Sequence, residues 1–387
     1  MRKISDTINR LAALRLAGTA NGFSAVSSRL TPLSDFGSNP GALNGHVYIP
    51  QTLAPNAALV VVLHGCTQNA GSYDIGAGWS DMADQHGFAL LFPEQQRQNN
   101  PNLCFNWFSP GDNRRDAGEA LSIRQMVAAV TARHGLDPAR VFVTGLSAGG
   151  AMTSVMLAAY PEIFVGGAII AGLPYGCAST VPQAFDRMRG HGMPSASELS
   201  ALVRAASNYN GTWPTLSIWH GTADATVSYG NAQAIIDQWR PLHRTHAEPD
   251  HVEIIGGHAR RAWNDPSGRE VIEEYSIHGM GHGTPLDTLS EDGFGMSGAY
   301  MLEANISSTL LICRFWELVQ ATDKGAARVV TKPALAPPEQ ALTHDAMGNA
   351  QLPIFARRAF VHNQDAHHTG GVGKIIEDAL RSAGLMR

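Results

Sequence analysis

The amino-acid sequence predicts an α/β fold with a mostly parallel central sheet flanked by helices. Segments with strand character alternate with segments of helical periodicity along most of the chain. Residues 58–65, ALVVVLHG, form a continuous apolar and β-branched stretch that ends in glycine, which is typical of a strand buried on both faces. With 387 residues, of which 44% are hydrophobic and 16% charged, the chain can bury a large core.

The elements after this first strand follow in order. Residues 79–87 have helical spacing and end in glycine, and residues 88–95 are predicted as the next strand. Residues 116–135 are predicted as a helix that begins with Asp116 as its cap and ends at Gly135. This helix places four apolar residues on one face: Leu121, Met126, Val127 and Val130.

The second half of the chain continues the alternation. Strands are expected at residues 140–145, 166–173, 215–221, 252–257 and 269–277. Helices are expected at residues 147–161, 195–207 and 231–242. Residues 299–319 are predicted as one long helix whose apolar face covers the sheet.

The composition argues against several classes of partner. The formal net charge is −5, and the sequence has no run of lysine and arginine that would form a nucleic-acid-binding surface. No segment reaches the apolar length of a membrane span. Polar residues interrupt the N-terminal segment, so it lacks the apolar stretch of a secretory signal, and we expect either a cytoplasmic protein or one whose signal peptide has been removed.

The chain has four widely spaced cysteines: Cys66, Cys104, Cys177 and Cys313. They form no CxxC pair and no cluster with histidine at zinc spacing, so neither a metal site nor a cofactor is predicted. The even count is compatible with two disulfides and equally with four buried thiols that act as small hydrophobic residues.

Ser147 is the candidate nucleophile. It lies in GLSAG, residues 145–149, which matches G-x-S-x-G between a predicted strand and a predicted helix. In that context the serine sits on a strained turn, and the flanking glycines prevent clashes with neighbouring backbone. The alternative is an ordinary glycine-rich turn that cradles a phosphate, but the segment lacks both G-x-x-x-x-G-K-[ST] and G-x-G-x-x-G.

An activated serine requires a histidine base and an orienting carboxylate. Asp224 follows an apolar strand and is the candidate acid; a simple turn role is the alternative, and Asp237 and Asp250 are rivals. His282 stands between glycines in a loop after a predicted strand and is the candidate base, with His278 as its nearest competitor. The order Ser, Asp, His is that of the G-x-S-x-G hydrolases.

The oxyanion hole and the substrate contacts are also predicted. The backbone N–H groups of Ala148 and Cys66 are the expected oxyanion donors. His64 lies beside Cys66 at a strand end and is a candidate substrate contact, although a plain strand terminus is the alternative. Trp107 is a second candidate contact, and a packing role is equally common for a tryptophan in a turn.

The sequence resembles the poly(3-hydroxybutyrate) depolymerase family of esterases, which are relatives of the feruloyl and acetylxylan esterases. The motifs that carry the resemblance lie between about residues 45 and 320: LHGCTQNA, CFNWFSPGDNRRDAGEALSIRQMV, TGLSAGGAM, AGLPYGCA, IWHGTADATV and GMGHGTPL. The resemblance implies an α/β-hydrolase fold and carboxylic ester hydrolysis, with Ser147, Asp224 and His282 on the triad positions. It also implies a Cys66–Cys104 disulfide and an extracellular location.

Three regions are expected on this basis. Residues 1–44 are predicted as an N-terminal helical or extended segment, residues 45–320 as the catalytic domain, and residues 321–387 as a proline-rich linker followed by a helix. We expect no separate domain for adsorption to solid polymer. Soluble oligomers or small esters are therefore favoured over solid polymer, and we expect the substrate to be a short-chain poly(3-hydroxyalkanoate) or its oligomers.

Two alternatives remain at this stage. One is an esterase for feruloyl groups, acetylxylan or small esters in general. The other is a silent hydrolase-fold protein that only binds a ligand, against which the intact Ser, Asp, His order argues because a binding protein has no need of all three. The oligomeric state is left open.

Overall fold

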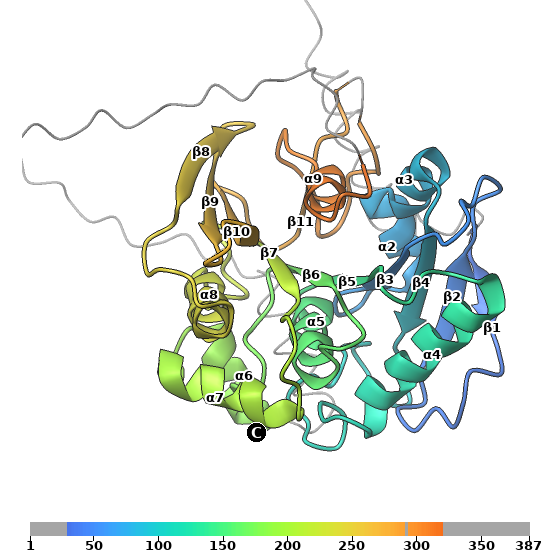
Figure 1. Ribbon diagram of the computed structural model, residues 1–387, viewed down its shortest axis with the longest axis horizontal. Coiled ribbons are helices and arrows are strands. Elements are labelled where there is room, and N and C mark those ends of the chain that lie inside the picture. The colour runs from blue at the N-terminus through green and yellow to red at the C-terminus, as the bar shows by residue number, and fades with distance from the viewer. Residues whose placement is uncertain (1–28, 291–292, 320–387) are drawn as a thin grey trace, which may run out of the picture.

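The computed structural model describes residues 29–290 and 293–319 (Figure 1). Its centre is a ten-stranded sheet of order β1-β2-β4-β3-β5-β6-β7-β10-β9-β8. The strands of this sheet are β1 (Thr31–Leu33), β2 (Asn44–Tyr48), β3 (Leu59–Leu63), β4 (Ala89–Glu94), β5 (Val141–Leu146), β6 (Gly166–Ile170), β7 (Thr215–Gly221), β8 (His251–Ile255), β9 (His258–Asn264) and β10 (Glu270–Ile277). A small second sheet pairs β11 (Thr284–Leu286) with β12 (Met301–Glu303).

The middle of the large sheet is parallel. Strands β4, β3, β5, β6, β7 and β10 run in one direction, whereas β1, β2, β9 and β8 add antiparallel edges. Every residue of β3 and β5 is buried, as expected for strands covered on both faces. The predicted α/β architecture is confirmed, and the carboxyl ends of the parallel strands meet at one edge, where ligand-facing loops collect.

Helices cover both faces of the sheet (Figure 1). The helices are α2 (Ala70–Ala77), α3 (Trp79–His86), α4 (Gly118–His134), α5 (Ala148–Ala159), α6 (Val181–Met188), α7 (Ala196–Ala206), α8 (Gly230–His243) and α9 (Ser308–Phe315). Helices α4 to α8 contribute to the core on one face, and α2, α3 and α9 to the core on the other.

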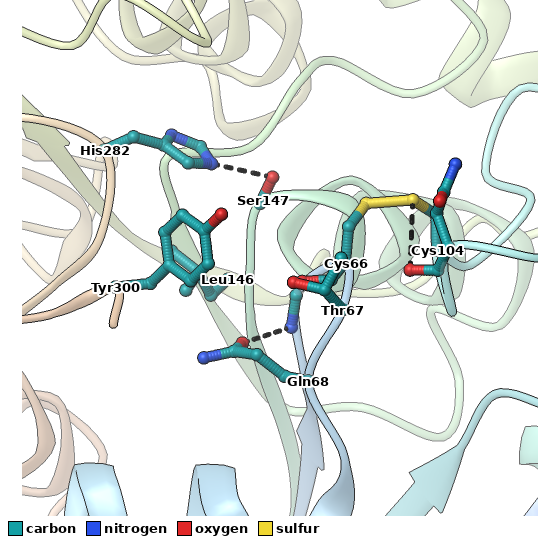
Figure 2. A pocket seen from close by; sticks show the side chains of 10 residues that line it. Cys66, Thr67, Gln68, Cys104, Leu146, Ser147, His282 and Tyr300 are labelled. Atoms are coloured by element: carbon teal, nitrogen blue, oxygen red, sulfur yellow. Dashed lines mark hydrogen bonds between the residues drawn. A yellow bond between two sulfur atoms is a disulfide. The ribbon is translucent and has the colours of Figure 1, made fainter. Parts of the chain in front are cut away.

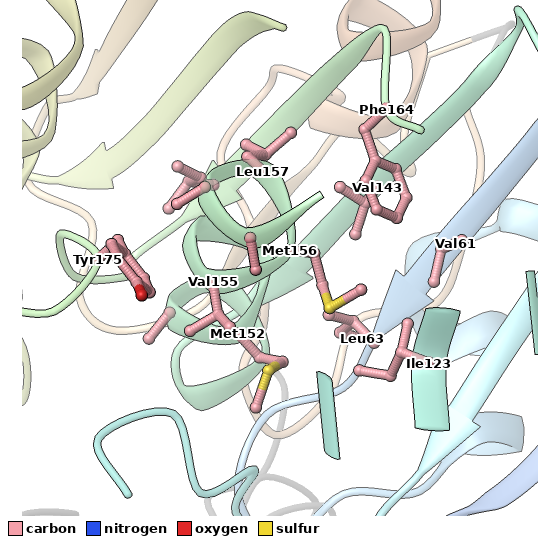
Figure 3. Close-up of a cluster of buried hydrophobic side chains, with 14 of the residues drawn as sticks. Val61, Leu63, Ile123, Val143, Met152, Val155, Met156, Leu157, Phe164 and Tyr175 are labelled. Atoms are coloured by element: carbon pink, nitrogen blue, oxygen red, sulfur yellow. The ribbon is translucent and has the colours of Figure 1, made fainter. Parts of the chain in front are cut away.

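The alternation of side chains along β3 separates the two cores. Val61 and Leu63 pack with Ile123 of α4 and Met152 of α5, as Figure 3 shows, whereas Val60 and Val62 face α2, α3 and α9. The two free cysteines follow the same division: Cys177 is buried in the first core and Cys313 in the second.

Some predicted elements are wrong. The segment at 299–319 is not one helix, because Asn305 has a positive φ of 54° and the chain forms β12 before α9 begins. Asp116 is not the cap of α4: it also has a positive φ, of 61°, and the N-cap is Ala117, which provides no side-chain acceptor. Leu121 is only half-buried.

Strand β9 was not predicted, because the pair of arginines in HARRAWN has the composition of a polar loop. In the structure these charges are paired across strands. Arg260 contacts Glu253 on β8 at 2.7 Å and Glu273 on β10 at 2.8 Å, so that a charged segment is accommodated inside the sheet.

The large sheet begins before the predicted boundary at residue 45, since Thr31–Leu33 pairs with β2. Residues 1–28 of the predicted N-terminal segment and the whole segment 321–387 lie outside the described residues. Among residues 29–290 and 293–319, no helix combines the length and the apolar character needed to cross a membrane.

Candidate active site

The turn between β5 and α5 is closed by steric contacts. Ser147 has φ 57° and ψ −115°, a conformation that costs about 1–3 kcal/mol in a non-glycine residue. A Cβ atom on Gly145 would lie 2.5 Å from the Gly149 backbone, and one on Gly149 would collide with the carbonyl oxygen of Leu63. Only glycine therefore fits at positions 145 and 149, and the turn places Ser147 at the carboxyl edge of the sheet.

The structure brings the three predicted triad residues together. His282 follows β10 and Asp224 follows the neighbouring parallel strand β7. His282 Nε2 lies 2.9 Å from Ser147 Oγ, and His282 Nδ1 lies 2.7 Å from Asp224 Oδ2. The side chains thus form one continuous hydrogen-bonded line.

The rival residues lie elsewhere and have other partners. Asp237 pairs with Arg240 on α8, and Asp250 accepts a hydrogen bond from the backbone of Asn264. The backbone N–H of His278 donates to His258. None of the three rivals approaches Ser147 through a hydrogen bond among the described residues.

Asp224 is held as a carboxylate. Burial opposes its ionisation, but hydrogen bonds from His220 and His282 outweigh burial and hold the pKa of Asp224 well below its ordinary value. Its Oδ1 atom also accepts the backbone N–H groups of Thr226 at 2.8 Å and Val227 at 2.9 Å. The carboxylate therefore stays charged and fixed beside the imidazole.

Cys66, in the loop after β3, lines the same cavity as Ser147 (Figure 2). Ala148 is the first residue of α5, so its N–H has no acceptor within the helix. The N–H of Cys66 makes no hydrogen bond among the described residues. The N–H groups of both predicted oxyanion donors are therefore unpaired among the described residues, and Cys66 and Ala148 line a cavity together with Ser147.

A disulfide joins this loop to a distant segment. Cys66 is bonded to Cys104, 38 residues away, as the resemblance implies. The neighbouring Thr67 N–H donates to the carbonyl oxygen of Asn102 at 2.7 Å, and Gln68 closes the turn by accepting the Gly65 N–H at 2.8 Å. We call residues 64–68 the oxyanion loop and residues 95–106 its supporting segment.

Comparison with known proteins decides the family. Residues 43–248 match the family model described as Esterase PHB depolymerase. Poly(3-hydroxyalkanoate) depolymerase C of Paucimonas lemoignei is 44% identical over 301 residues, which cover 76% of this chain and 72% of that protein. This chain belongs to the esterase PHB depolymerase family.

Two further relatives extend the comparison. Feruloyl esterase B of Talaromyces stipitatus is 32% identical, and the match covers 70% of this esterase and 77% of that protein. The solved structure of an acetyl xylan esterase from Aspergillus awamori has a TM-score of 0.61 at 26% identity, over 65% of this chain and 93% of that chain. The fold is the α/β-hydrolase fold, and the chain is a carboxylic ester hydrolase.

The supporting segment of the esterase is anchored on a buried carboxyl group. Glu119, at the start of α4, accepts hydrogen bonds from Gln95 Nε2 at 2.6 Å, from the Asn106 N–H at 2.8 Å and from Asn106 Nδ2 at 2.7 Å. Burial raises the pKa of Glu119 to about 8, against these hydrogen bonds. The carboxyl group ties the segment that carries Cys104 to the body of the fold.

The prediction that His64 contacts substrate is wrong. The side chain is buried, with 1% of its surface exposed. Its Nε2 accepts the Gln95 N–H at 3.1 Å, so Nδ1 carries the proton and donates to the carbonyl oxygen of Gly65 at 2.8 Å. Burial lowers the pKa of His64, and the neutral ring links β3 to the supporting segment behind the pocket.

Two cavities of the esterase meet at Ser147. One is lined by His282, Tyr300, Thr67 and Gln68 and is shown in Figure 2. The other is mostly apolar, and its apolar lining includes Trp107, Phe108, Leu173, Phe185, Met188 and Val227. We call them the Tyr300 cavity and the Trp107 cavity. Cys66, Asn102, Cys104 and Ser147 line both.

Sequence reasoning found Trp107 but missed the rest of these walls. Phe185 and Met188 lie on α6, for which no helix was predicted. Tyr300 lies in a segment that was predicted as helical. Its positive φ of 62°, which would have marked it, depends on tertiary contacts and has no signature in the sequence.

Proposed function

We propose that the esterase hydrolyses its substrate through Ser147, His282 and Asp224 by way of an acyl-enzyme. The observation that carries the proposal is the line of hydrogen bonds from Ser147 through His282 to Asp224, with lengths of 2.9 Å and 2.7 Å, at a strained strand-to-helix turn. This combination of nucleophile, base and orienting acid activates a serine hydroxyl.

In the first half-reaction Ser147 Oγ attacks the ester carbonyl carbon and its proton passes to His282 Nε2. The carbonyl oxygen becomes an oxyanion, which accepts hydrogen bonds from the N–H groups of Cys66 and Ala148. When the intermediate collapses, the bond from carbon to the alcohol oxygen breaks and His282 gives its proton to that oxygen. Alcohol leaves, and the acyl group remains on Ser147.

In the second half-reaction water takes the place of the alcohol. It attacks the acyl carbon, loses a proton to His282 and forms a second oxyanion at the same two N–H groups. Collapse returns the proton to Ser147 and releases the carboxylic acid. Asp224 stabilises the imidazolium in both halves and holds Nδ1 as the protonated nitrogen.

For the substrate we propose oligomers of short-chain poly(3-hydroxyalkanoates). The relative that is 44% identical is named as a poly(3-hydroxyalkanoate) depolymerase. The Trp107 cavity supports an uncharged acyl group, because no charged side chain lines it. The second candidate is a feruloyl ester, which is favoured by the aromatic pair Trp107 and Phe108 in the same cavity and by a relative of that activity at 32% identity.

The catalytic proposal is tested with three variants. Ser147→Ala is expected to lower kcat on p-nitrophenyl butyrate on the order of 10⁶-fold. Asp224→Asn is expected to lower it on the order of 10⁴-fold, because the imidazole then adopts the wrong tautomer. Asp237→Asn is the matched control and should retain activity, since Asp237 pairs with Arg240 on α8. Full turnover by Ser147→Ala would contradict the proposal.

A substrate panel separates the two substrate candidates. Hydroxybutyrate oligomers, amorphous polymer film, p-nitrophenyl acyl esters and methyl ferulate are compared by kcat/KM. We expect the oligomers to be preferred over methyl ferulate and over the film. A higher kcat/KM for methyl ferulate would replace the polyester assignment with the feruloyl one.

A further inference from the structure

The positions of the two cavities define how an ester must lie across Ser147. In the tetrahedral intermediate one oxygen faces the N–H groups of Cys66 and Ala148, and the alcohol oxygen must lie within reach of His282 Nε2 to receive its proton. The acyl chain takes the remaining direction. The oxyanion, the alcohol oxygen and the acyl chain therefore each point in a different direction from Ser147.

The lining of the cavities follows the same division. His282 lines the Tyr300 cavity and does not line the Trp107 cavity, whereas Ala148 lines only the Trp107 cavity. The alcohol portion of the ester accordingly extends past His282 into the Tyr300 cavity. The acyl portion extends past Ala148 toward Trp107 and α6.

We propose that Tyr300 recognises the alcohol portion of the ester by a hydrogen bond from its hydroxyl to an acceptor on that portion. The proposal rests on the proposed function, in which His282 protonates the leaving alcohol. It assigns a specificity role to a residue that takes no part in the proton transfers.

The local structure places Tyr300 where this role requires it. Its carbonyl oxygen accepts the Thr284 N–H at 2.8 Å, and the pairing of β11 with β12 fixes it next to His282. The two rings meet edge to face, with centroids 6.2 Å apart at 81°. Figure 2 shows the Tyr300 hydroxyl turned toward Ser147.

Two observations distinguish Tyr300 from a packing residue. Its φ of 62° is strained for a bulky side chain, so the surrounding structure must hold Tyr300 in this conformation. Its hydroxyl makes no hydrogen bond among the described residues, although Thr67 and Gln68 line the same cavity. The hydroxyl is thus free to donate to a substrate.

The geometry also indicates the chemical class of the alcohol. An acceptor near the leaving oxygen is present when the alcohol is a 3-hydroxyalkanoate ester, because its own carbonyl is separated from that oxygen by two carbon atoms. A simple secondary alcohol of similar shape lacks the acceptor. Tyr300 should therefore favour the interior linkages of a polyester over simple alkyl esters.

The test uses two substrates with the same acyl group: methyl 3-(butanoyloxy)butanoate, whose alcohol carries the acceptor, and butan-2-yl butanoate, whose alcohol does not. Tyr300→Phe is expected to lower kcat/KM on the first ester about two- to tenfold, the value of one hydrogen bond, and to leave the second unchanged. Tyr209→Phe is the matched control, since that hydroxyl donates to Thr212 away from both cavities. The ratio of the two kcat/KM values is independent of the fraction of folded enzyme.

A second variant tests the other side of the serine. Phe185→Ala enlarges the Trp107 cavity and is expected to shift preference from butanoyl to octanoyl p-nitrophenyl esters while the ratio for the two alcohols stays constant. Equal losses on both alcohols in Tyr300→Phe, or a change of alcohol ratio in Phe185→Ala, would overturn the inference. Ser147→Ala is measured in the same assays to separate the two proposals. If it abolishes turnover while Tyr300→Phe or Phe185→Ala gives one of these contrary results, the role of Tyr300 is rejected and the proposed function stands.

Discussion

The nucleophile turn and the oxyanion loop are adjacent, but they are held by different means. The turn at residues 145–150 lies between β3 and β6 and is fixed by backbone contacts that only glycine permits. The oxyanion loop depends on a disulfide and on the carboxyl group of Glu119 behind its supporting segment. Both segments follow central strands of the sheet, β5 and β3. The turn is confined by the backbone packed around it, whereas the loop is held by a covalent bond and by hydrogen bonds to its supporting segment.

The largest effect on turnover within this comparison is expected from disturbing the steric contacts around the turn. In Gly149→Ala the added Cβ collides with the Leu63 carbonyl oxygen and lies 2.5 Å from that of His64. We expect the free energy of unfolding to fall by an amount in the upper part of the roughly 1–3 kcal/mol range for overpacking, or more. We also expect kcat to fall about 10²-fold, because Ser147 is displaced. Thermal unfolding and ester turnover measure the two effects.

The control for this variant is Gly230→Ala at the start of α8. Its Cβ would lie 3.7 Å from the nearest side-chain atom, so stability should be unchanged or rise by about 0.4–1 kcal/mol. If Gly149→Ala behaved like this control, the turn would not be fixed by steric contacts.

Removing the disulfide is expected to have a smaller effect on turnover and a larger effect on stability. The double variant Cys66→Ser and Cys104→Ser opens a loop of 38 residues, which the chain-entropy model values at about 4 kcal/mol. We expect kcat to fall by less than the roughly 10²- to 10³-fold cost of losing an oxyanion donor, because Gln68 and Thr67 still hold the loop. A midpoint of urea unfolding that reductant leaves unchanged in the unmodified enzyme would contradict the prediction.

A smaller effect is expected from Glu119→Gln. The new amide nitrogen would face one of the donor groups of Gln95 and Asn106, which leaves buried polar groups unpaired and costs about 1–3 kcal/mol. The exposed Glu248→Gln is the control and should change stability by less than about 0.5 kcal/mol. Equal unfolding free energies for both variants would show that the carboxyl group does not anchor the supporting segment.

The smallest effect concerns pH. Because burial raises the pKa of Glu119 from 4.5 to about 8, the folded state binds this proton more tightly than the unfolded state. The contribution of protonated Glu119 to the free energy of unfolding is complete below about pH 4.5 and is lost as pH rises to about 8. The difference in unfolding free energy between the unmodified enzyme and Glu119→Gln should therefore decrease from pH 5 to pH 8, as urea titrations would reveal. A constant difference would mean that Glu119 does not titrate in this range.

Local sequence patterns identified the parts of the site that follow strand ends. Ser147, Asp224 and His282 each lie within five residues of the end of a strand in the parallel part of the sheet. Because parallel strands have their carboxyl ends at one edge, chain order was enough to group the three residues. The central sheet was predicted for the same reason. The Cys66–Cys104 bond followed from the family resemblance.

The parts that depend on long-range contacts could not be predicted. The position of Tyr300 depends on the pairing of β11 with β12, and its apolar neighbours suggested a helix instead. The burial of His64 depends on Gln95, which a strand at another place in the chain provides. The periodicity of hydrophobic residues indicates which face of a helix or strand is buried, but not which loops meet at the carboxyl edge of the sheet.

The burial of Cys177 and Cys313 on opposite faces of the sheet gives the molecule two internal reporters of its own motion. Burial raises the pKa of the Cys177 thiol to about 12 and raises that of Cys313 as well, so both are inert to thiol reagents until the surrounding layer opens. Labelling rates under native conditions therefore measure opening of each helical layer separately. Equal rates would mean that the two layers open together as one cooperative unit.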